Sequence, residues 1–175
     1  MHYNHIVIGA GSMGMAAGYF LAKEKRKTLV VDAFNPPHDK ASHHGETRLI
    51  RYAYGEGLEY VPFALRAGSL WQELTKKTNK HIFHQTGILN VAEKDSSFAD
   101  NVLASAQKFS LPLEVYSAAE VNEKWSGIQI PENFIGCFEP TSGVLKVEDC
   151  IAAYRELATK EGAEIRTNSR VVKID

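Results

Sequence analysis

The sequence predicts an α/β fold built around a parallel sheet, and three observations carry this prediction. First, an apolar run at residues 5–8 leads into the turn Gly-Ala-Gly-Ser-Met-Gly at residues 9–14. Second, a stretch with the apolar stripe of a helix follows, and another apolar run at residues 28–31 ends on Asp32. Third, strand-like and helix-like segments alternate again toward the C-terminus. This order is typical of a Rossmann-like βαβ unit that binds a dinucleotide.

Each glycine of the turn has its own predicted role. Gly9 permits the tight turn, Gly11 lets backbone N–H groups approach a diphosphate, and Gly14 lets the helix pack close to the strand. Asp32, about 20 residues further on, is expected to accept hydrogen bonds from the adenosine ribose. The helix N-terminus faces the phosphates with its positive dipole end and begins with Ser12 and Met13.

The rest of the chain divides into further predicted elements. Residues 35–45 carry the proline and glycine signals of a loop. A capping box at Ser117 and Glu120 indicates where one helix begins, whereas the first helix lacks the glycine that often closes such helices. Apolar periodicity predicts helices over 60–75, 97–108, 117–125 and 147–162. Strands are expected over 86–91, 113–116, 135–138, 163–166 and 171–174.

Three ranges follow as a domain hypothesis. Residues 1–79 form the first part of a dinucleotide-binding domain, 80–140 form part of a second, strand-rich substrate lobe, and 141–175 return to the first domain. The chain stops at Asp175 directly after a strand-like run, so we expect it to be truncated there. An unpaired strand edge near Ile174 is then expected to promote self-association.

The composition excludes several classes of partner. Among 175 residues the net charge is −1, so no basic excess indicates nucleic acid. No apolar run approaches the 18 or more residues that span a bilayer, and no signal peptide precedes the first strand, which predicts a cytoplasmic protein without a membrane partner. Cys137 and Cys150 lack metal-ligand spacing, so we expect buried free thiols and no metal site.

Residues 42–57 are the most specific part of the chain, reading Ser-His-His-Gly-Glu-Thr-Arg-Leu-Ile-Arg-Tyr-Ala-Tyr-Gly-Glu-Gly. With this block the chain resembles the monomeric sarcosine oxidase family, which includes N-methyltryptophan oxidase, among the glycine/D-amino-acid oxidase flavoenzymes. The resemblance runs across the whole chain. It includes the glycine turn, Asp32-Ala33-Phe34 with the Pro-Pro-His after it, Tyr60-Val61-Pro62, and Phe138-Glu139-Pro140 leading to Ser142-Gly143.

The resemblance implies an FAD-dependent oxidase of secondary amino acids such as N-methylglycine. In such enzymes the C–H bond beside nitrogen is delivered to the flavin as a hydride equivalent. The imine hydrolyses to formaldehyde and the free amino acid, and O2 is reduced to H2O2. The implied partners are therefore FAD, a small secondary amino acid and O2.

The family's functional residues fall on the block at residues 42–57. Arg51 matches the arginine that pairs with the substrate carboxylate, where a planar guanidinium gives bidentate recognition. Arg48 matches the arginine beside the isoalloxazine ring, and His44 matches a histidine on the substrate side, which makes it a second catalytic candidate. The resemblance implies that Tyr54 is a pocket wall. Ser42, His43 and Thr47 match residues that contact the cofactor. Outside this block, Val171 is expected as a backbone contact to adenine, because a late strand of this fold passes there.

Other interpretations stay open. Without the family, Arg48 and Arg51 at i, i+3 are more often a solvated helix face, the two histidines a loop surface, and Tyr52 and Tyr54 core aromatics. An NAD(P)-dependent dehydrogenase shares the glycine turn and an acid such as Asp32, but the block at 42–57 has no evident role there. A non-catalytic dinucleotide-binding module is the third class. Flavin colour separates the first two, and bound cofactor without turnover indicates the third.

The resemblance also implies groups outside this chain. The family's flavin-linking cysteine, a lysine that activates oxygen and a second lysine for the substrate lie in its C-terminal half, and neither Cys137 nor Cys150 matches the linking cysteine. We therefore expect residues 1–175 to lack activity by themselves. Tyr52 and Phe63 are too few pocket walls to select one N-methyl amino acid.

Overall fold

The computed structural model describes residues 2–174, which form two compact units. Unit 1 contains the described residues up to Arg48, Trp71–Ile82 and those from Lys146 onward. Unit 2 contains Leu49–Leu70 and Phe83–Leu145. Residues 49–70 were expected in the first domain range, but in this division they belong to unit 2.

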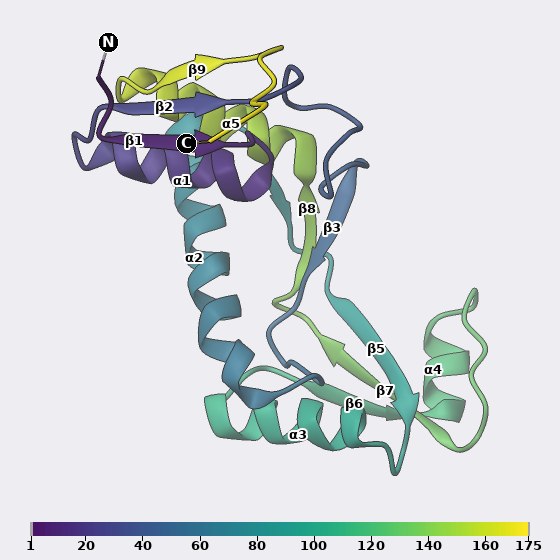
Figure 1. The fold of residues 1–175 in the computed structure, drawn as a ribbon. Coiled ribbons are helices and arrows are strands. Elements are labelled where there is room, and N and C mark those ends of the chain that lie inside the picture. The colour runs from purple at the N-terminus through teal and green to yellow at the C-terminus, as the bar shows by residue number, and fades with distance from the viewer. Residues whose placement is uncertain (1, 175) are drawn as a thin grey trace. The chain divides into compact units, whose positions relative to one another are not determined.

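Unit 1 is built on a parallel three-stranded sheet in the order β1-β2-β9 (Figure 1). β1 (His5–Ile8), α1 (Ser12–Lys23) and β2 (Thr28–Val31) form the predicted βαβ unit, with His5 opposite Thr28 in the register. β9 (Glu164–Arg166) pairs with the other edge of β2, so β2 is the central strand. All four residues of β2 are buried, as expected for a strand covered by neighbours on both edges and by a helix.

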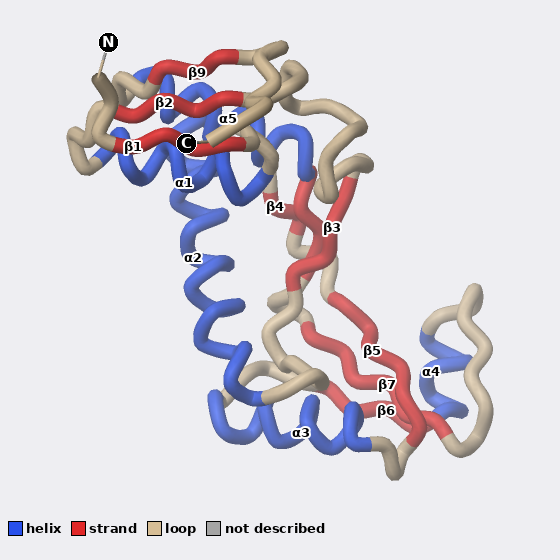
Figure 2. Tube along the Cα trace, in the orientation of Figure 1, coloured by secondary structure: helices blue, strands red, loops and turns tan. Residues whose placement is uncertain are grey.

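The helices of unit 1 pack through aromatic residues. α1 contacts β1 and β2, and α5 (Val147–Lys160) runs along α1 (Figure 2). The Tyr19 ring on α1 lies 5.7 Å from the Tyr154 ring on α5, and Trp71 meets the same Tyr154 ring edge-on at 5.7 Å. Burial of these large rings provides much of the apolar core beneath the sheet.

The glycine turn has the geometry that the sequence predicts. Gly9 has φ +95°, a backbone conformation that residues other than glycine rarely adopt. A Cβ atom at Gly14 would lie 1.8 Å from the carbonyl oxygen of Gly9. Only glycine therefore lets α1 begin this close to the end of β1.

α1 ends without a glycine because a lysine takes over the same backbone role. Lys25 adopts the left-handed conformation with φ +59°. The N–H of Lys25 donates to the carbonyl of Ala22 and that of Arg26 to the carbonyl of Leu21. These bonds satisfy carbonyls of the last turn in the manner of a glycine cap.

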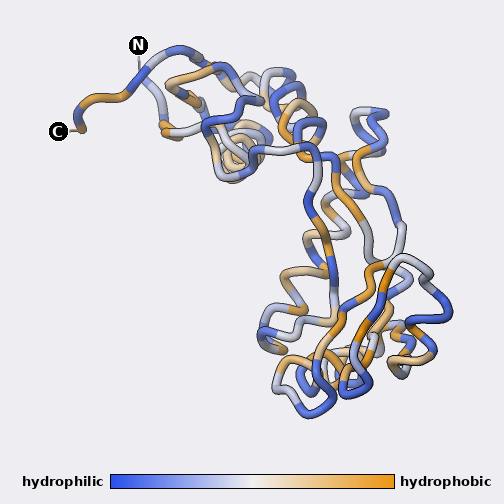
Figure 3. Tube along the Cα trace, turned by 90° about the vertical axis from the view of Figure 1, so that its right-hand side faces the viewer, coloured by the Kyte–Doolittle hydropathy of each residue, from blue (hydrophilic) through white to orange (hydrophobic). Residues whose placement is uncertain are grey.

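Unit 2 is built on an antiparallel sheet with β7 (Phe134–Glu139) between β5 (Ile88–Glu93) and β6 (Glu114–Ser117). α3 (Ser97–Phe109) packs along β5, and α4 (Ala118–Lys124) packs against β6 and β7. Apolar and polar stretches alternate along these elements (Figure 3). The buried core cluster between α3 and the sheet consists of Ala53, Val102, Ala106 and Cys137.

Sequence patterns locate the helices but miss three of the short strands. The predicted capping box is present, since the Ser117 side chain and Glu120 bond reciprocally at the start of α4. α2 spans Val61–Thr78 after a 3-10 turn at Leu58–Tyr60. Three short strands have no sequence prediction, because no apolar run bounded by turn residues marks them in the sequence. They are β3 (Thr47–Ile50), β4 (Phe83–His84) and β8 (Gly143–Lys146), of which β4 and β8 pair antiparallel.

The strand prediction for residues 171–174 is wrong. These residues form no strand, and Val172 and Ile174 are 88% and 76% exposed. β-Branched residues favour a strand where a neighbouring strand supplies hydrogen bonds, and no strand within residues 2–174 pairs with this run. The expected strand edge near Ile174 is therefore absent, and β1 is a sheet edge instead. Self-association stays a prediction.

Both cysteines are free and buried, as predicted. Burial, aided by the negative charge of Asp149, raises the pKa of the Cys150 thiol to about 12, so this thiol is inert at neutral pH. No helix within residues 2–174 is long and apolar enough to cross a membrane.

Substituting Gly14→Ala tests the close approach of α1 to β1. The added methyl group meets a backbone oxygen that cannot move away without shifting the chain, so we expect the free energy of unfolding to fall by about 3 kcal/mol. Urea denaturation measures this loss. Gly127→Ala is the matched control, because a Cβ there meets nothing within 4 Å. Equal stability of the two variants would contradict the packing argument.

Candidate functional site

A cavity of about 360 Å³ lies at the carboxyl ends of β1 and β2 in unit 1. This edge is where open parallel sheets bind their ligands. Gly9, Gly11, Asp32 and Val171, four of the predicted cofactor contacts, line it together. The other lining residues come from the strand ends, the loop after β2 and the chain after β9: Ile8, Val31, Ala33, Phe34, His38, Lys40, Ala41, Ser169 and Arg170.

Asp32 ties together the chain segments that form this cavity. Its side chain is buried, and its Oδ2 accepts the N–H of Ala10 at 2.6 Å. Its Oδ1 accepts the N–H of Phe34 at 2.8 Å and lies 3.2 Å from Nε2 of His38. A carboxylate accepts about four hydrogen bonds, so Oδ2 retains capacity for one more donor.

The same contacts keep Asp32 ionised. Burial by itself would raise the pKa of this carboxyl group. Hydrogen bonds from the N–H groups of Ala10 and Phe34, and the His38 ring, outweigh burial and lower the pKa below its usual value. An ionised carboxylate is the form that accepts hydrogen bonds from a ribose diol.

The N-terminus of α1 presents unused donors. Gly11 is its N-cap residue, no side chain caps the helix, and no acidic residue stands in its first turn. The first N–H groups of a helix have no partner inside it, and the helix dipole adds positive potential there. Met13 is 85% exposed, so solvent and ligands reach this turn. The backbone N–H groups at Ser12 and Met13 are therefore suited to bind an anion.

His43 is a buried imidazole without hydrogen bonds. Neither Nδ1 nor Nε2 has a partner among the described residues. Burial, with smaller effects of His38 and Arg48, lowers the pKa of this ring, so it is neutral at pH 7. A Cβ at Gly11 would lie 3.2 Å from Nδ1. A buried polar group without a partner calls for an explanation, and a ligand seated on the glycine turn supplies one.

Arg48 forms hydrogen bonds to the backbone of its own loop, which carries the predicted site residues Ser42, His44 and Thr47. Its Nη1 donates to the carbonyl of Thr47 at 2.8 Å, and its Nη2 donates to the carbonyls of Ser42 and His44 at 3.0 and 2.9 Å. Of the five N–H donors of a guanidinium, these bonds use three. The side chains of Ser42 and His44 are exposed, so their carbonyls, not their side chains, shape the loop.

Arg51 and Tyr54 belong to unit 2 and form a separate arrangement there. The Arg51 guanidinium lies over the Tyr54 ring at 5.1 Å and over the Phe98 ring at 5.5 Å, and it pairs with Glu56. The Tyr54 ring in turn packs on Tyr60 at 5.7 Å. Cation–π contacts on two rings orient the guanidinium while its side chain stays 22% exposed.

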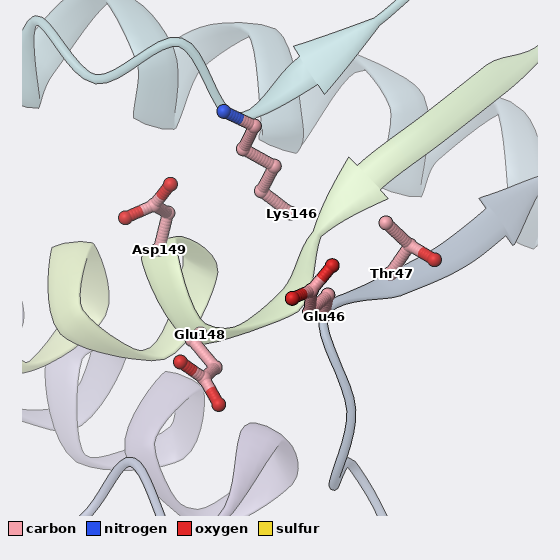
Figure 4. A pocket seen from close by; sticks show the side chains of 5 residues that line it. All are labelled: Glu46, Thr47, Lys146, Glu148 and Asp149. Atoms are coloured by element: carbon pink, nitrogen blue, oxygen red, sulfur yellow. The ribbon is translucent and has the colours of Figure 1, made fainter.

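Thr47 does not line the cavity beside Asp32. It lines a second cavity of about 350 Å³ in unit 1, with Glu46, Lys146, Glu148 and Asp149 (Figure 4). Figure 4 shows the three carboxylates at separate places around it, not converging on one point. Within residues 2–174 no cluster of histidine, cysteine and carboxylate side chains could hold a metal ion.

Three lining residues of this cavity carry no motif that identifies them in the sequence: His38, Lys40 and Arg170. His38 entered only as part of the Pro-Pro-His resemblance, although its ring contacts Asp32 and meets the Phe34 ring edge-on at 5.2 Å. No spacing rule connects Arg170 with the glycine turn, because the two meet only through the fold. The signal for His38 was its position six residues after the acid, in a loop that must return over the site.

Comparisons with known proteins identify the family to which the chain belongs. Residues 4–175 match the family model described as FAD dependent oxidoreductase, so the chain belongs to that family. It is 54% identical over 175 residues to monomeric sarcosine oxidase of Bacillus sp. (strain B-0618), covering 99% of this chain and 45% of that protein. It is 42% identical over 175 residues to N-methyl-L-tryptophan oxidase of Yersinia pestis (strain Pestoides F), covering 100% and 47%. The predicted resemblance is thereby confirmed, and the chain spans about half the length of these curated relatives.

Solved structures confirm the predicted fold class. The structure resembles L-proline dehydrogenase from P. horikoshii with a TM-score of 0.81 at 22% identity, over 97% of this chain and 45% of that one. It also resembles the open form of NikD, an amino acid oxidase of nikkomycin biosynthesis, with a TM-score of 0.83 at 22% identity, over 95% and 43%. At this identity the likeness concerns the fold alone.

The lowered pKa of His43 predicts a pH-dependent stability. The unfolded imidazole titrates near 6.5, so below that pH the unfolded state binds more protons than the folded state. The free energy of unfolding of the wild type should therefore fall as the pH decreases from 6.5 toward the lower folded pKa. His43→Phe keeps a ring without this titration and should lose that part of the slope. Denaturation between about pH 5 and 8 measures it, and parallel curves for the two proteins would contradict the neutral buried imidazole.

Proposed function

We propose that the protein is an FAD-dependent oxidase of secondary amino acids of the N-methyl type, such as sarcosine, with O2 reduced to H2O2. The observation that carries this proposal is the 54% identity to monomeric sarcosine oxidase across the chain. Because the chain spans about half the length of that relative, the turnover is assigned to the whole protein. In this proposal the residues of unit 1 bind the cofactor, and Arg51, a residue of unit 2, binds the substrate carboxylate.

The residues of unit 1 fit the ADP part of FAD. Asp32 would accept hydrogen bonds from the ribose, and the N–H groups at the start of α1 would bind the diphosphate. The unpaired nitrogens of His43 beside Gly11 fit a polar ligand at the same turn. Val171, which lines the same cavity, is proposed as the adenine contact. When bound, FAD supplies the acceptor for a hydride equivalent.

The proposed substrate contacts come from the block at residues 42–57. Arg51 would bind the substrate carboxylate in bidentate fashion, and Tyr54, on which its guanidinium rests, would form a wall of the pocket. Arg48 is proposed to place positive charge beside the flavin ring, which becomes anionic on reduction. His44 and Thr47 remain proposed contacts on the loop that Arg48 closes, together with Ser42.

An absorbance spectrum of the purified protein, recorded before and after acid precipitation, is the first test. Flavin bands support the proposal, and colour left in the precipitate indicates a covalent link. Anaerobic addition of sarcosine to the coloured protein should bleach the bands. A colourless protein that binds a nicotinamide cofactor would overturn the proposal in favour of a dehydrogenase. Stable flavin without bleaching by any N-methyl amino acid would indicate a non-catalytic module.

Asp32→Asn tests the cofactor end of the site. The amide loses the charge that accepts hydrogen bonds from the ribose, so the Kd for FAD should rise about tenfold or more. Quenching of flavin fluorescence measures the Kd. Asp39→Asn changes an exposed carboxylate in the loop after β2 and should leave the Kd for FAD unchanged. Equal affinities of both variants would contradict the role of Asp32.

Arg51→Lys tests the substrate end. Lysine keeps the charge but loses the planar fork that binds a carboxylate and stacks on rings, so the KM for sarcosine should rise about ten- to a hundredfold. Steady-state oxygen consumption by the whole protein loaded with FAD measures it. Arg26→Lys, on an exposed arginine after α1, is the control. An unchanged KM in Arg51→Lys would remove Arg51 from substrate binding.

A further inference from the structure

The segment that carries Arg51 is held in place by a buried carboxylate from far along the chain. Residues 51–56 form neither helix nor strand. The N–H groups of Tyr52 and Ala53 both donate to Oε2 of Glu139, at 2.8 and 2.9 Å. Glu139 is the last residue of β7, 86 positions beyond Ala53. It therefore supplies hydrogen bonds that a neighbouring strand would otherwise supply.

Two side chains of α3 hold the carbonyl groups of the same segment. The hydroxyl of Ser105 donates to the carbonyl of Tyr54 at 3.0 Å, and the side-chain amide of Asn101 donates to the carbonyl of Gly55 at 2.9 Å. With the two hydrogen bonds to Glu139 included, the backbone of each of the four residues 52–55 is hydrogen-bonded to a side chain. Such tethering satisfies the backbone of an irregular segment that is half-buried.

The carboxylate of Glu139 is buried and accepts four hydrogen bonds. It is 1% exposed, and besides the two N–H groups it accepts Nδ2 of Asn90 at 2.8 Å and Oγ of Ser142 at 2.9 Å. All four donors are neutral groups. A carboxylate this deeply buried is costly unless hydrogen bonds compensate it, so its position and that of the backbone donors depend on each other.

The tethered segment sets the place of the Arg51 guanidinium. The guanidinium rests on the rings of Tyr54 and Phe98. Gly55 packs so tightly against Phe98 that a Cβ there would lie 2.4 Å from the ring. A shift of the backbone at residues 52–55 therefore displaces both rings and the arginine that they orient.

We propose that Glu139 is a positioning residue: through the backbone of Tyr52 and Ala53 it holds Arg51 where the substrate carboxylate binds. Glu139 acts on the backbone and not on the substrate itself. The inference rests on the proposed role of Arg51 as the carboxylate-binding residue. Asn101 and Ser105 complete the same arrangement from α3.

The test compares Glu139→Ala with Glu139→Gln in the whole protein loaded with FAD. Alanine leaves two buried N–H groups without an acceptor. Glutamine keeps a carbonyl oxygen in the place of Oε2, and Asn90 can turn its amide to accept the new NH2 group. Hydrogen exchange by NMR reports the protection of the Tyr52 and Ala53 amides, and oxygen consumption reports KM and kcat for sarcosine.

In Glu139→Ala we expect exchange at Tyr52 and Ala53 to speed up about ten- to a hundredfold, and KM to rise about tenfold or more with a smaller change in kcat. Glu139→Gln should restore both to within about threefold. Val121→Ala is the control, because it removes a fully buried side chain of unit 2 outside the core cluster that contains Ala53 and removes none of the hydrogen bonds to residues 52–55. It should lower stability without a selective effect on these two amides or on KM.

The outcomes separate this inference from the proposed function. Unchanged exchange at Tyr52 and Ala53 in Glu139→Ala overturns the inference, whatever the substrate is. Faster exchange with an unchanged KM overturns it as well, because the tie would then serve folding alone. A wild-type protein that oxidises no N-methyl amino acid overturns the proposed function, while the exchange data still decide whether Glu139 holds the segment.

Discussion

The carboxylate of Asp32 is the interaction on which unit 1 depends most. It joins the turn after β1 to the loop after β2 by accepting the N–H groups of Ala10 and Phe34. Strand pairing alone aligns β1 with β2 but leaves the loops beyond their ends unconstrained. A single buried anion that accepts donors from both loops fixes the cavity's walls relative to each other before any ligand enters. The residue proposed to bind the ribose thus also builds the site.

Unit 2 repeats this solution with Glu139. In both units a buried carboxylate gathers backbone N–H groups from an irregular segment that carries proposed binding residues. Charged acceptors form stronger hydrogen bonds than neutral ones, which suits segments without a neighbouring strand. Arg48 provides the opposite arrangement, because its guanidinium gathers backbone carbonyls of its own loop. Charged side chains therefore give these loops an order that their secondary structure does not.

The sequence predicts the βαβ unit and the larger helices because their signals are local. The glycine turn, the apolar runs and the capping box at Ser117 each depend on neighbouring residues, and their elements occur as expected. The strand predicted at 171–174 failed because β-propensity describes a side chain and not the presence of a partner strand. The short strand β8 escaped prediction for the converse reason, since pairing with β4 and not composition defines it.

In the candidate site, too, the residues with local sequence signals were predictable and those placed by distant contacts were not. Gly9, Gly11 and Asp32 are recognisable because their spacing follows a known motif, whereas Lys40 and Arg170 reach the cavity through loops that no periodicity describes. The isolation of His43 and the ties of Glu139 appear only in three dimensions. Both consist of hydrogen bonds, made or missing, between residues that are distant in sequence.

The distance between Glu139 and the segment it holds has a consequence for synthesis on the ribosome. The acceptor for the Ala53 amide is made 86 residues after the amide itself. At about 5–20 residues per second, the Arg51 segment exists for roughly 4 to 17 seconds before its anchor has been translated. Its N–H groups bond to water during that interval. The arginine therefore reaches its final place late, when β7 is complete, although it belongs to the first third of the chain.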